Sequence, residues 1–478
     1  MRIAPTFRST PCWTPALSGR TPMDTTTPAL SDFRDFDAFV DYAFDGIGYK
    51  TTRDNLGLYV QSRLLTIDRK NSEVSGAHLA PAPHKADAYR QKLTRSTLNE
   101  WPTEAVTERL WALAYQIMPN ASAWIIDSSG IPKKGDKSVG VAHQYCGELG
   151  KLANCQVLVS VHLSTSTLSL PLIMDLFLPE EWAFDPDRRA EVGVPEDIEF
   201  RSKPQMAVDQ IDRLLDAGCA QKVVVADADF GANQEFRKSL QMRGLEYMGG
   251  TRKNVTVMRP NKLRHHDQEA MSLFEVAKAL PDKAFCTITW REGTKGELSS
   301  RFAALRVVPA QGRHFGKELE EEQWLLIEWP EGEKEPRHYW FSNLSQRTSI
   351  RRLVRLAMLR WRIERDYQDL KQELGLKDYQ GRMWRGFHHH LSCAWPRCTT
   401  WRFTARFFPL KRAPSIGRVR RNLEEALMER LGHCIHCRRP YGPHESPPPT
   451  ESAELRPRSK LRDVGRRVFM RIREKVIR

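Results

Sequence analysis

Two short apolar runs, each ended by an aspartate, constrain the fold of this chain most strongly. The segment 124–126 (Trp-Ile-Ile) precedes Asp127, and the segment 223–226 (Val-Val-Val-Ala) precedes Asp227. Short apolar runs bounded by turns are typical of buried strands. Carboxylates that follow such strands meet at one edge of a sheet, where α/β proteins usually bind ligands. Either aspartate alone could simply open a turn.

The pattern around these two runs indicates an α/β fold. Apolar residues recur at helical spacing over residues 36–118, with an interruption by prolines at 80–84. From residue 119 to residue 245 the pattern changes to short strands, such as 157–162 and 170–174, and then to alternating strands and helices. This order of elements predicts an α/β domain with a mixed sheet.

The segments after residue 245 differ from those before it. Helical spacing mostly disappears over residues 246–345, where β-prone segments alternate with charged turns, so we expect a β-rich region. Residues 349–374 then show a strong helical pattern with one apolar stripe, and Gly375 stands where a helix would be capped.

The composition bounds the size and the compartment. A chain of 478 residues, 40% of them hydrophobic, is too long for one ordinary domain, so we expect two or three domains. Nine cysteines without a framework spacing fit a reducing cytosol. No apolar run approaches the roughly 18 residues of a membrane span. We therefore expect a cytoplasmic protein without membrane segments.

The two ends of the chain differ from its middle. Residues 1–35 are rich in Thr, Pro and Ser and are expected to be disordered. The formal net charge of +15 comes from residues 379–478, which hold 23 Lys and Arg against 8 Asp and Glu, whereas residues 1–378 hold 51 of each. We expect a basic, irregular tail over residues 393–478, and the net charge alone is weak support for a function.

Glu364 is a third candidate carboxylate, in the helical pattern of residues 349–374. Between residues 347 and 365 there are seven arginines and this single acid. At about 100° per residue, Arg360 and Lys371 lie within roughly 40° of Glu364, so the three side chains share one helical face. That face borders the apolar stripe, which places Glu364 near the edge of the core. The alternative is an intrahelical ion pair, worth a few tenths of a kcal/mol.

This helix resembles the third motif of bacterial insertion-sequence transposases of the DDE superfamily. One branch of that superfamily carries a Tyr-x2-Arg-x3-Glu-x6-Lys signature. Arg360, Glu364 and Lys371 match its last three positions, while Ala357 stands at the tyrosine position.

Two further segments resemble the first and second carboxylate motifs of the same family. They are residues 126–135 (Ile-Asp-Ser-Ser-Gly-Ile-Pro-Lys-Lys-Gly) and residues 226–231 (Ala-Asp-Ala-Asp-Phe-Gly). Ser129 stands where threonine is usual, and Asp229 where a small residue is usual. The three motifs follow the order of the family, and the similarity extends over roughly residues 50–390.

The resemblance implies an α/β fold with an RNase H-like core of mixed sheet, interrupted by a β-rich insertion. The 137 residues from Asp227 to Glu364 are too many for a simple connection, and the β-patterned segment fills this gap. The expected domains are a lead (1–35), a helical DNA-binding domain (36–118), the first part of the core (119–245), the insertion (246–345), the second part of the core (346–392) and the basic tail (393–478).

The resemblance also implies metal-dependent DNA cleavage and strand transfer at the terminal inverted repeats of an insertion sequence. Asp127, Asp227 and Glu364 would be the catalytic and metal-binding residues, because three carboxylates can hold two divalent ions about 3.5–4 Å apart for in-line displacement at phosphorus. Oxygen ligands favour Mg²⁺ or Mn²⁺.

The implied partner is double-stranded DNA, at the element ends and at the target. Four cations would hold its phosphates: Lys133, Lys134, Arg360 and Lys371. Because two element ends must be brought together, a homodimer is expected. The implied location is the bacterial cytoplasm, in association with the nucleoid.

Two alternative functions stay open from the sequence. One is a catalytically inactive, transposase-derived DNA-binding protein from a truncated or frameshifted copy, because residues 391–408 mix Trp, Pro, Cys and Arg where the family has an apolar helix. The other is a metal-dependent hydrolase of a small phosphate ester. That alternative explains the aspartates but leaves the arginine-rich helix unexplained.

Three other features carry weaker hypotheses. His388, His389 and His390 are expected to be structural, because adjacent helical residues point in different directions. Cys434 and Cys437 form half of a zinc site at best, because no second cysteine pair follows them. Asp229 is a possible additional metal ligand only if it lies on the same side as Asp227.

Overall fold

The computed structural model describes residues 36–260, 270–293, 296–310, 321–393 and residue 424. The expected disordered lead, nearly all of the expected basic tail and the Cys434/Cys437 pair lie outside the described residues. In the part of the chain that is described, no helix is long and apolar enough to cross a membrane.

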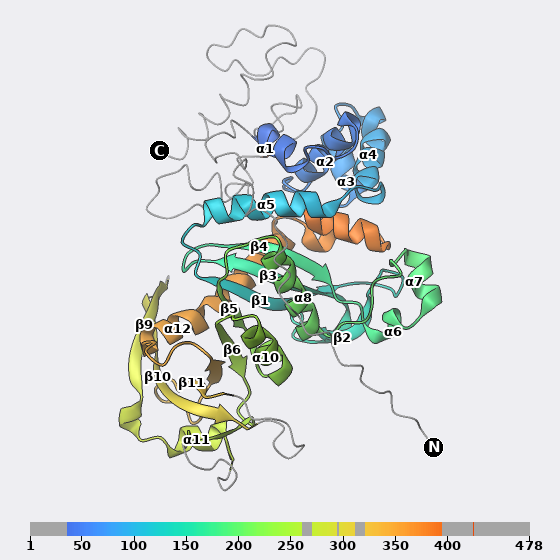
Figure 1. Cartoon of the computed structure of the whole chain (residues 1–478). Coiled ribbons are helices and arrows are strands. Elements are labelled where there is room, and N and C mark those ends of the chain that lie inside the picture. The colour runs from blue at the N-terminus through green and yellow to red at the C-terminus, as the bar shows by residue number, and fades with distance from the viewer. Residues whose placement is uncertain (1–35, 261–269, 294–295, 311–320, 394–423, 425–478) are drawn as a thin grey trace, which may run out of the picture.

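In the part of the chain that is described, five α-helices precede the first strand, in agreement with the helical pattern expected for residues 36–118. Figure 1 shows α1 to α4 together at one end of the molecule and α5 running along the sheet. Trp111 of α5 donates its indole N–H to the carbonyl of Leu172, 2.8 Å away, and both lie in one continuous hydrophobic core. The helices are α1 (Phe36–Ala43), α2 (Lys50–Ser62), α3 (Ser72–Leu79), α4 (Ala86–Leu98) and α5 (Thr103–Ile117).

The central sheet is mixed, as the sequence predicts, and largely antiparallel. Strands β1, β5 and β6 pair in parallel, and the other strand pairs of the described residues are antiparallel. The order β4-β3-β1-β5-β6 is consistent with the expected RNase H-like core. The strands are β1 (Ala123–Pro132), β2 (Ala142–Cys146), β3 (Lys151–Ser164), β4 (Ser169–Leu176), β5 (Val223–Ala226) and β6 (Tyr247–Thr251).

Helices between β4 and β6 cover the sheet. The longest of them, α8, begins at a capping box in which Ser202 and Gln205 satisfy each other's backbone N–H groups, and it buries Ile211 and Leu214 against the sheet. The helices are α6 (Glu180–Ala183), α7 (Pro186–Val192), α8 (Lys203–Asp216), α9 (Ala228–Gly231) and α10 (Gln234–Met242).

The β-rich region expected after residue 245 continues the central sheet. Strand β12 pairs with β6, so the sheet runs on through β12, β11 and β10 to the end of the molecule opposite α1 (Figure 1). Its elements are β7 (Thr256–Met258), β8 (Met271–Ser272), α11 (Leu273–Ala279), β9 (Cys286–Gly293), β10 (Gly296–Pro309), β11 (Gln323–Glu328) and β12 (His338–Ser342).

The helix expected over residues 349–374 is interrupted. It consists of α12 (Ile350–Ala357), a 3₁₀ turn (Met358–Arg360) and α13 (Trp361–Gln372). The expectation of one continuous α-helix was therefore wrong, and the tighter turn shifts the angular phase of α13 relative to α12. Gly375 does follow the helix with a left-handed φ of 69°, as predicted for its cap. Residues 384–393 are helical again.

Candidate active site

Asp127 and Asp227 lie side by side at the end of the parallel ladder between β1 and β5. The last pair of that ladder is Ile126 with Ala226, so each aspartate is the first residue beyond it. Adjacent strands are about 4.8 Å apart, which brings the two carboxylates close together. The sequence predicted this convergence from the two apolar runs.

Asp127 differs from its prediction in one respect. We expected β1 to end at Asp127, but the strand continues to Pro132 because it keeps its antiparallel partner β3, opposite Ser160. The aspartate is buried, and one oxygen accepts the N–H of Ser128 at 2.8 Å. The pKa of Asp127 is raised to about 7, mainly by burial. The negative charge of Asp227 also raises this pKa, by more than the Arg360 guanidinium lowers it.

Asp227 also caps a helix. One carboxylate oxygen accepts the backbone N–H groups of Asp229 and Phe230, at 2.9 and 3.3 Å, and so caps the short helix α9. The turn-opening role that the sequence left as an alternative is therefore present at Asp227. Burial raises the pKa of Asp227, and the nearby charge of Asp229 adds to the effect.

Gly231 and Gly250 allow Asp227 to approach β6, and the sequence pattern did not indicate them. A Cβ on Gly250 would lie 2.8 Å from the backbone nitrogen of Ala228, and one on Gly231 would lie 2.4 Å from the carbonyl oxygen of Gly250. Any side chain at these positions would displace the turn that holds Asp227. A glycine pair late in an apolar strand is the pattern that could have indicated this close approach.

Glu364 joins the two aspartates through Arg360. The Arg360 guanidinium pairs with Glu364 one turn along the helix and with Asp127 of β1, at 3.2 Å. The pKa of Arg360 is lowered by burial but raised overall, because Asp127, Glu364 and Asp227 all act on it. The contact is thus more than an intrahelical ion pair. We call Asp127, Asp227, Glu364 and Arg360 the carboxylate cluster.

Glu364 is more exposed than expected. Its side chain is 57% accessible, whereas that of Asp127 is 10% accessible. The cluster therefore has a buried end at Asp127, a half-buried Asp227 and an open end at Glu364.

The three predicted phosphate-binding lysines have different surroundings. Lys134 is exposed. Lys133 donates to the carbonyl of Tyr379 at 2.6 Å, and burial lowers its pKa to about 8. Lys371 is buried, donates to the carbonyl of Gly130 and pairs with Glu148 at 3.0 Å. In this conformation two of the three lysines are bound to protein groups.

The cluster fits a divalent cation by its donor chemistry. All of its acidic donors are carboxylate oxygens. The pKa values of Asp127 and Asp227 are raised by burial and by neighbouring negative charges, which a cation would relieve. In the described residues, no group of three or more His, Cys, Asp or Glu side chains is already arranged to hold a metal ion. Here the Arg360 guanidinium offsets part of the negative charge of these carboxylates.

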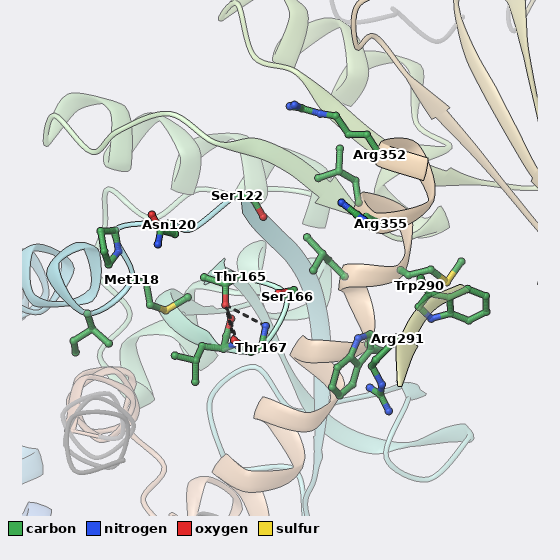
Figure 2. Close-up of a pocket in the computed structure, with 17 residues that line it drawn as sticks. Met118, Asn120, Ser122, Thr165, Ser166, Thr167, Trp290, Arg291, Arg352 and Arg355 are labelled. Carbon is green, nitrogen blue, oxygen red and sulfur yellow. Dashed lines mark hydrogen bonds between the residues drawn. The ribbon is translucent and has the colours of Figure 1, made fainter. Parts of the chain in front are cut away.

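A basic pocket of about 980 Å³ borders the cluster. It lies between the end of α5, the turn between β3 and β4, strand β9 and helix α12. Figure 2 shows arginines from β9 and α12 on one side and the 165–167 turn on the other. Three of its lining residues are arginines, Arg291, Arg352 and Arg355, and none is acidic. We call it the arginine pocket.

The arginine pocket and the carboxylate cluster are joined through Trp361. This residue lines the pocket and follows Arg360 directly in the sequence. The Arg291 guanidinium of β9 lies over the Trp361 ring, 3.8 Å from its centroid. The β-rich region therefore contacts the helix that carries Glu364.

The three consecutive histidines, which we call the histidine cluster, have protein partners. The His389 ring stacks on Trp101 at 4.2 Å, and its Nδ1 is bonded to the carbonyl of Thr97 at 2.9 Å. His390 bonds to the hydroxyl of Tyr59 at 2.8 Å. The contacts agree with the structural role expected for them.

Asp229 points to a different partner from Asp227. It pairs with Arg252 at 2.8 Å, and both side chains are mostly exposed. Nothing in this geometry directs Asp229 toward the carboxylate cluster.

The fold and the site define a class of nucleases, and comparison with known proteins agrees. Residues 43–297 match the family of DDE superfamily endonucleases, and residues 201–394 match the transposase DDE domain. The first match spans more than half of the chain, so the chain belongs to the DDE superfamily of endonucleases. This confirms the family expected from the motifs, while the tyrosine-containing signature stays a prediction.

A relative points to a more specific group within that class. The chain is 25% identical, over 289 residues, to the probable transposase for insertion sequence element IS701 from Microchaete diplosiphon. The match covers 59% of this chain and 66% of the relative, just under two thirds of its length.

Proposed function

We propose that this chain is a DDE transposase that binds the terminal inverted repeats of its insertion sequence, cleaves the DNA and transfers the cut strands to a target. The observation that carries the proposal is that Arg360 pairs with Asp127 and Glu364, while Asp227 follows the strand beside Asp127. Asp127 comes from β1, Asp227 follows β5 and Glu364 comes from α13, so three distant segments build one site. Family membership and the IS701 relative support the same function.

In this proposal Asp127, Asp227 and Glu364 are the catalytic residues and hold two Mg²⁺ or Mn²⁺ ions. When bound, such ions supply an activated oxygen nucleophile and stabilise the leaving oxygen at phosphorus. Asp127 would hold the ions at the buried end of the site, and the exposed Glu364 leaves the other end open to a DNA strand. Arg360 can donate two parallel hydrogen bonds to a phosphate once it leaves its carboxylate partners.

The arginine pocket supports contact with the DNA backbone. A basic surface without acidic residues attracts phosphates and releases counterions when it binds them. Arg352 and Arg355 are exposed and therefore accessible to a duplex. With Lys133, Lys134 and Lys371, they would form the DNA-binding surface beside the cluster, and the helical and β-rich regions would extend it. A homodimer would hold two element ends together.

The test is cleavage of a labelled duplex that carries the ends flanking the gene, with Mn²⁺ and purified full-length protein. We expect cleavage by the wild type and its loss in Asp127→Ala, Asp227→Ala and Glu364→Ala, with duplex binding largely retained. Asp216→Ala, an exposed acid at the end of α8, is the matched control. Undiminished cleavage by the Glu364→Ala protein would overturn the assignment.

Duplex binding and ester hydrolysis by the same protein separate the two alternative functions. Salt-dependent duplex binding without any cleavage by the wild type would indicate an inactive, transposase-derived DNA-binding protein. Hydrolysis of a small phosphate ester without duplex binding would indicate a metal-dependent phosphate-ester hydrolase. The three arginines of the arginine pocket favour a partner with several phosphates over a small phosphate ester.

A further inference from the structure

Four polar side chains are buried directly behind Asp127, between strand β3 and helix α13. Ser160 and His162 come from β3, and Asp366 and Tyr367 come from α13; none is more than 6% exposed. We call these four residues the buried polar layer. Neither the motifs nor the family matches assign them a role.

The first half of the layer connects α13 to Asp127 itself. The Tyr367 hydroxyl is bonded to the Ser160 hydroxyl at 2.6 Å and lies 3.4 Å from the carbonyl oxygen of Asp127. Ser160 is paired with Asp127 in the β1–β3 register, so the Tyr367 hydroxyl contacts both strands. Tyr367 lies three residues after Glu364, one turn along the same helix.

The second half of the layer fixes the same helix to the same strand. His162 Nδ1 and a carboxylate oxygen of Asp366 are 2.9 Å apart, in a pair that is almost fully buried. The His162 ring also packs against Tyr367, with 5.5 Å between the ring centroids. Two consecutive residues of α13 thus contact alternate residues of β3, which restrains both the rotation and the sliding of the helix.

Stability alone does not explain this arrangement well. Apolar residues of similar volume would pack between a helix and a sheet without the cost of removing a histidine, a carboxylate and two hydroxyls from water. Polar contacts are directional, whereas apolar contacts tolerate small shifts. A misplacement of about 1 Å at a reacting centre can cost roughly 100-fold in rate, so directional contacts have value here.

We propose that Ser160, His162, Asp366 and Tyr367 are positioning residues that set the separation between Asp127 and Glu364. The inference rests on the proposed function, because it assumes that these two carboxylates share metal ions. The Tyr367–Ser160 contact joins α13, which carries Glu364, to β3, which is paired with the strand of Asp127. Its loss would let Glu364 move relative to Asp127 without removing any metal ligand.

The main test is the Tyr367→Phe protein, which loses only the hydroxyl oxygen. We expect the Mn²⁺ concentration for half-maximal cleavage to rise at least about tenfold, the range typical when a group that orients a metal ligand is removed. The Mn²⁺-induced rise in Tm should weaken in parallel, and duplex affinity should stay unchanged. The matched control is Tyr339→Phe, because Tyr339 is a buried tyrosine of β12 whose hydroxyl has no hydrogen-bond partner among the described residues.

A second set of variants distinguishes a positioning role from a loss of folding stability. The double variant Ser160→Ala/Tyr367→Phe should raise the Mn²⁺ requirement little beyond either single change, because each change removes the same Ser160–Tyr367 hydrogen bond. His162→Leu should also raise it, and His162→Asn, which keeps an N–H donor, should restore part of the effect. A merely structural role predicts altered Tm with an unchanged Mn²⁺ requirement in all of these proteins.

The outcomes separate this inference from the proposed function. If the wild type cleaves and Tyr367→Phe shows the Mn²⁺ requirement of Tyr339→Phe, the positioning role is wrong and the transposase assignment stands. If the wild type neither cleaves DNA nor gains thermal stability from Mn²⁺, the proposed function fails, and the positioning role fails with it.

Discussion

The carboxylate cluster and the histidine cluster both gather side chains that commonly bind metals, but they differ in how those side chains are satisfied. His389 and His390 have protein partners, supplied by Thr97, Trp101 and Tyr59. In contrast, Asp127 lies beside the negative charge of Asp227 at the end of the parallel ladder and shares the Arg360 guanidinium with Glu364.

This difference indicates which cluster performs chemistry. Histidines that are satisfied by their own protein hold elements together, here the helix at 384–393 and the N-terminal helices. Carboxylates that are crowded without enough positive charge are prepared for an added cation. Residue type alone would not separate the two clusters, because both contain potential ligands.

The largest expected difference between the clusters is in DNA cleavage. Asp127→Ala should lower the single-turnover cleavage rate by about 1,000-fold or more, because a lost metal ligand removes several kcal/mol of transition-state stabilisation. His389→Phe, which keeps an aromatic ring beside Trp101, should stay within a few-fold of the wild type. Equal losses in the two proteins would remove the distinction between the clusters.

The histidine cluster should instead control stability in acid. Burial lowers the pKa of His389 to about 4 from the ordinary 6.5, so the unfolded chain binds a proton more readily than the folded chain. The stability contribution is therefore complete above pH 6.5 and is lost as the pH falls toward 4, by about 2 kcal/mol between pH 7 and pH 5. Urea unfolding at the two pH values measures it. His389→Phe should weaken this dependence, and His143→Gln, at an exposed position, should keep it.

The role of Arg360 as a counterion predicts a smaller effect without metal. Arg360→Ala should lower the free energy of unfolding by roughly 1–2 kcal/mol, because the buried Asp127 loses its positive partner while Arg360 itself is partly exposed. Added Mn²⁺ should then raise the Tm of this protein more than that of the wild type. An equal rise in Tm for both proteins would show that Arg360 does not neutralise the cluster.

The arginine pocket gives the smallest expected effect. Arg352→Ala and Arg355→Ala should each reduce the magnitude of the slope of log K for duplex binding against log[salt] by about one. That change corresponds to the release of about one counterion fewer. Arg213→Ala, at an exposed arginine of α8 that pairs with Asp175, should leave the slope unchanged. Identical slopes for all three variants would exclude the pocket from the DNA-binding surface.

The sequence predicted the elements of the site better than their contacts. Short apolar runs predicted strands before Asp127 and Asp227, and the arginine-rich helical pattern predicted the helix of Glu364. It could not predict that Ile126 pairs with Ala226, because strand register depends on residues far apart in the chain. The 3₁₀ turn before Trp361 was missed for a similar reason, since helical spacing does not reveal a change of pitch.

The buried polar layer was also beyond prediction from sequence. Ser160 and His162 lie in a strand that the pattern identifies only as apolar, and Asp366 and Tyr367 lie on a helix whose apolar stripe was read from other residues. Their contacts join segments about 200 residues apart. The Lys371 contacts were missed likewise, because Glu148 and the Gly130 carbonyl come from a distant part of the sheet.

The central claim is that Asp127, Asp227 and Glu364 together bind divalent cations. The most direct measurement is the loss of the free Mn²⁺ signal in electron paramagnetic resonance as purified protein is added, since it counts bound ions without requiring activity. Our account predicts saturable binding by the wild type and by His389→Phe, and greatly weakened binding by Asp127→Ala, Asp227→Ala and Glu364→Ala. Equal Mn²⁺ binding by the wild type and by all three alanine variants would contradict it.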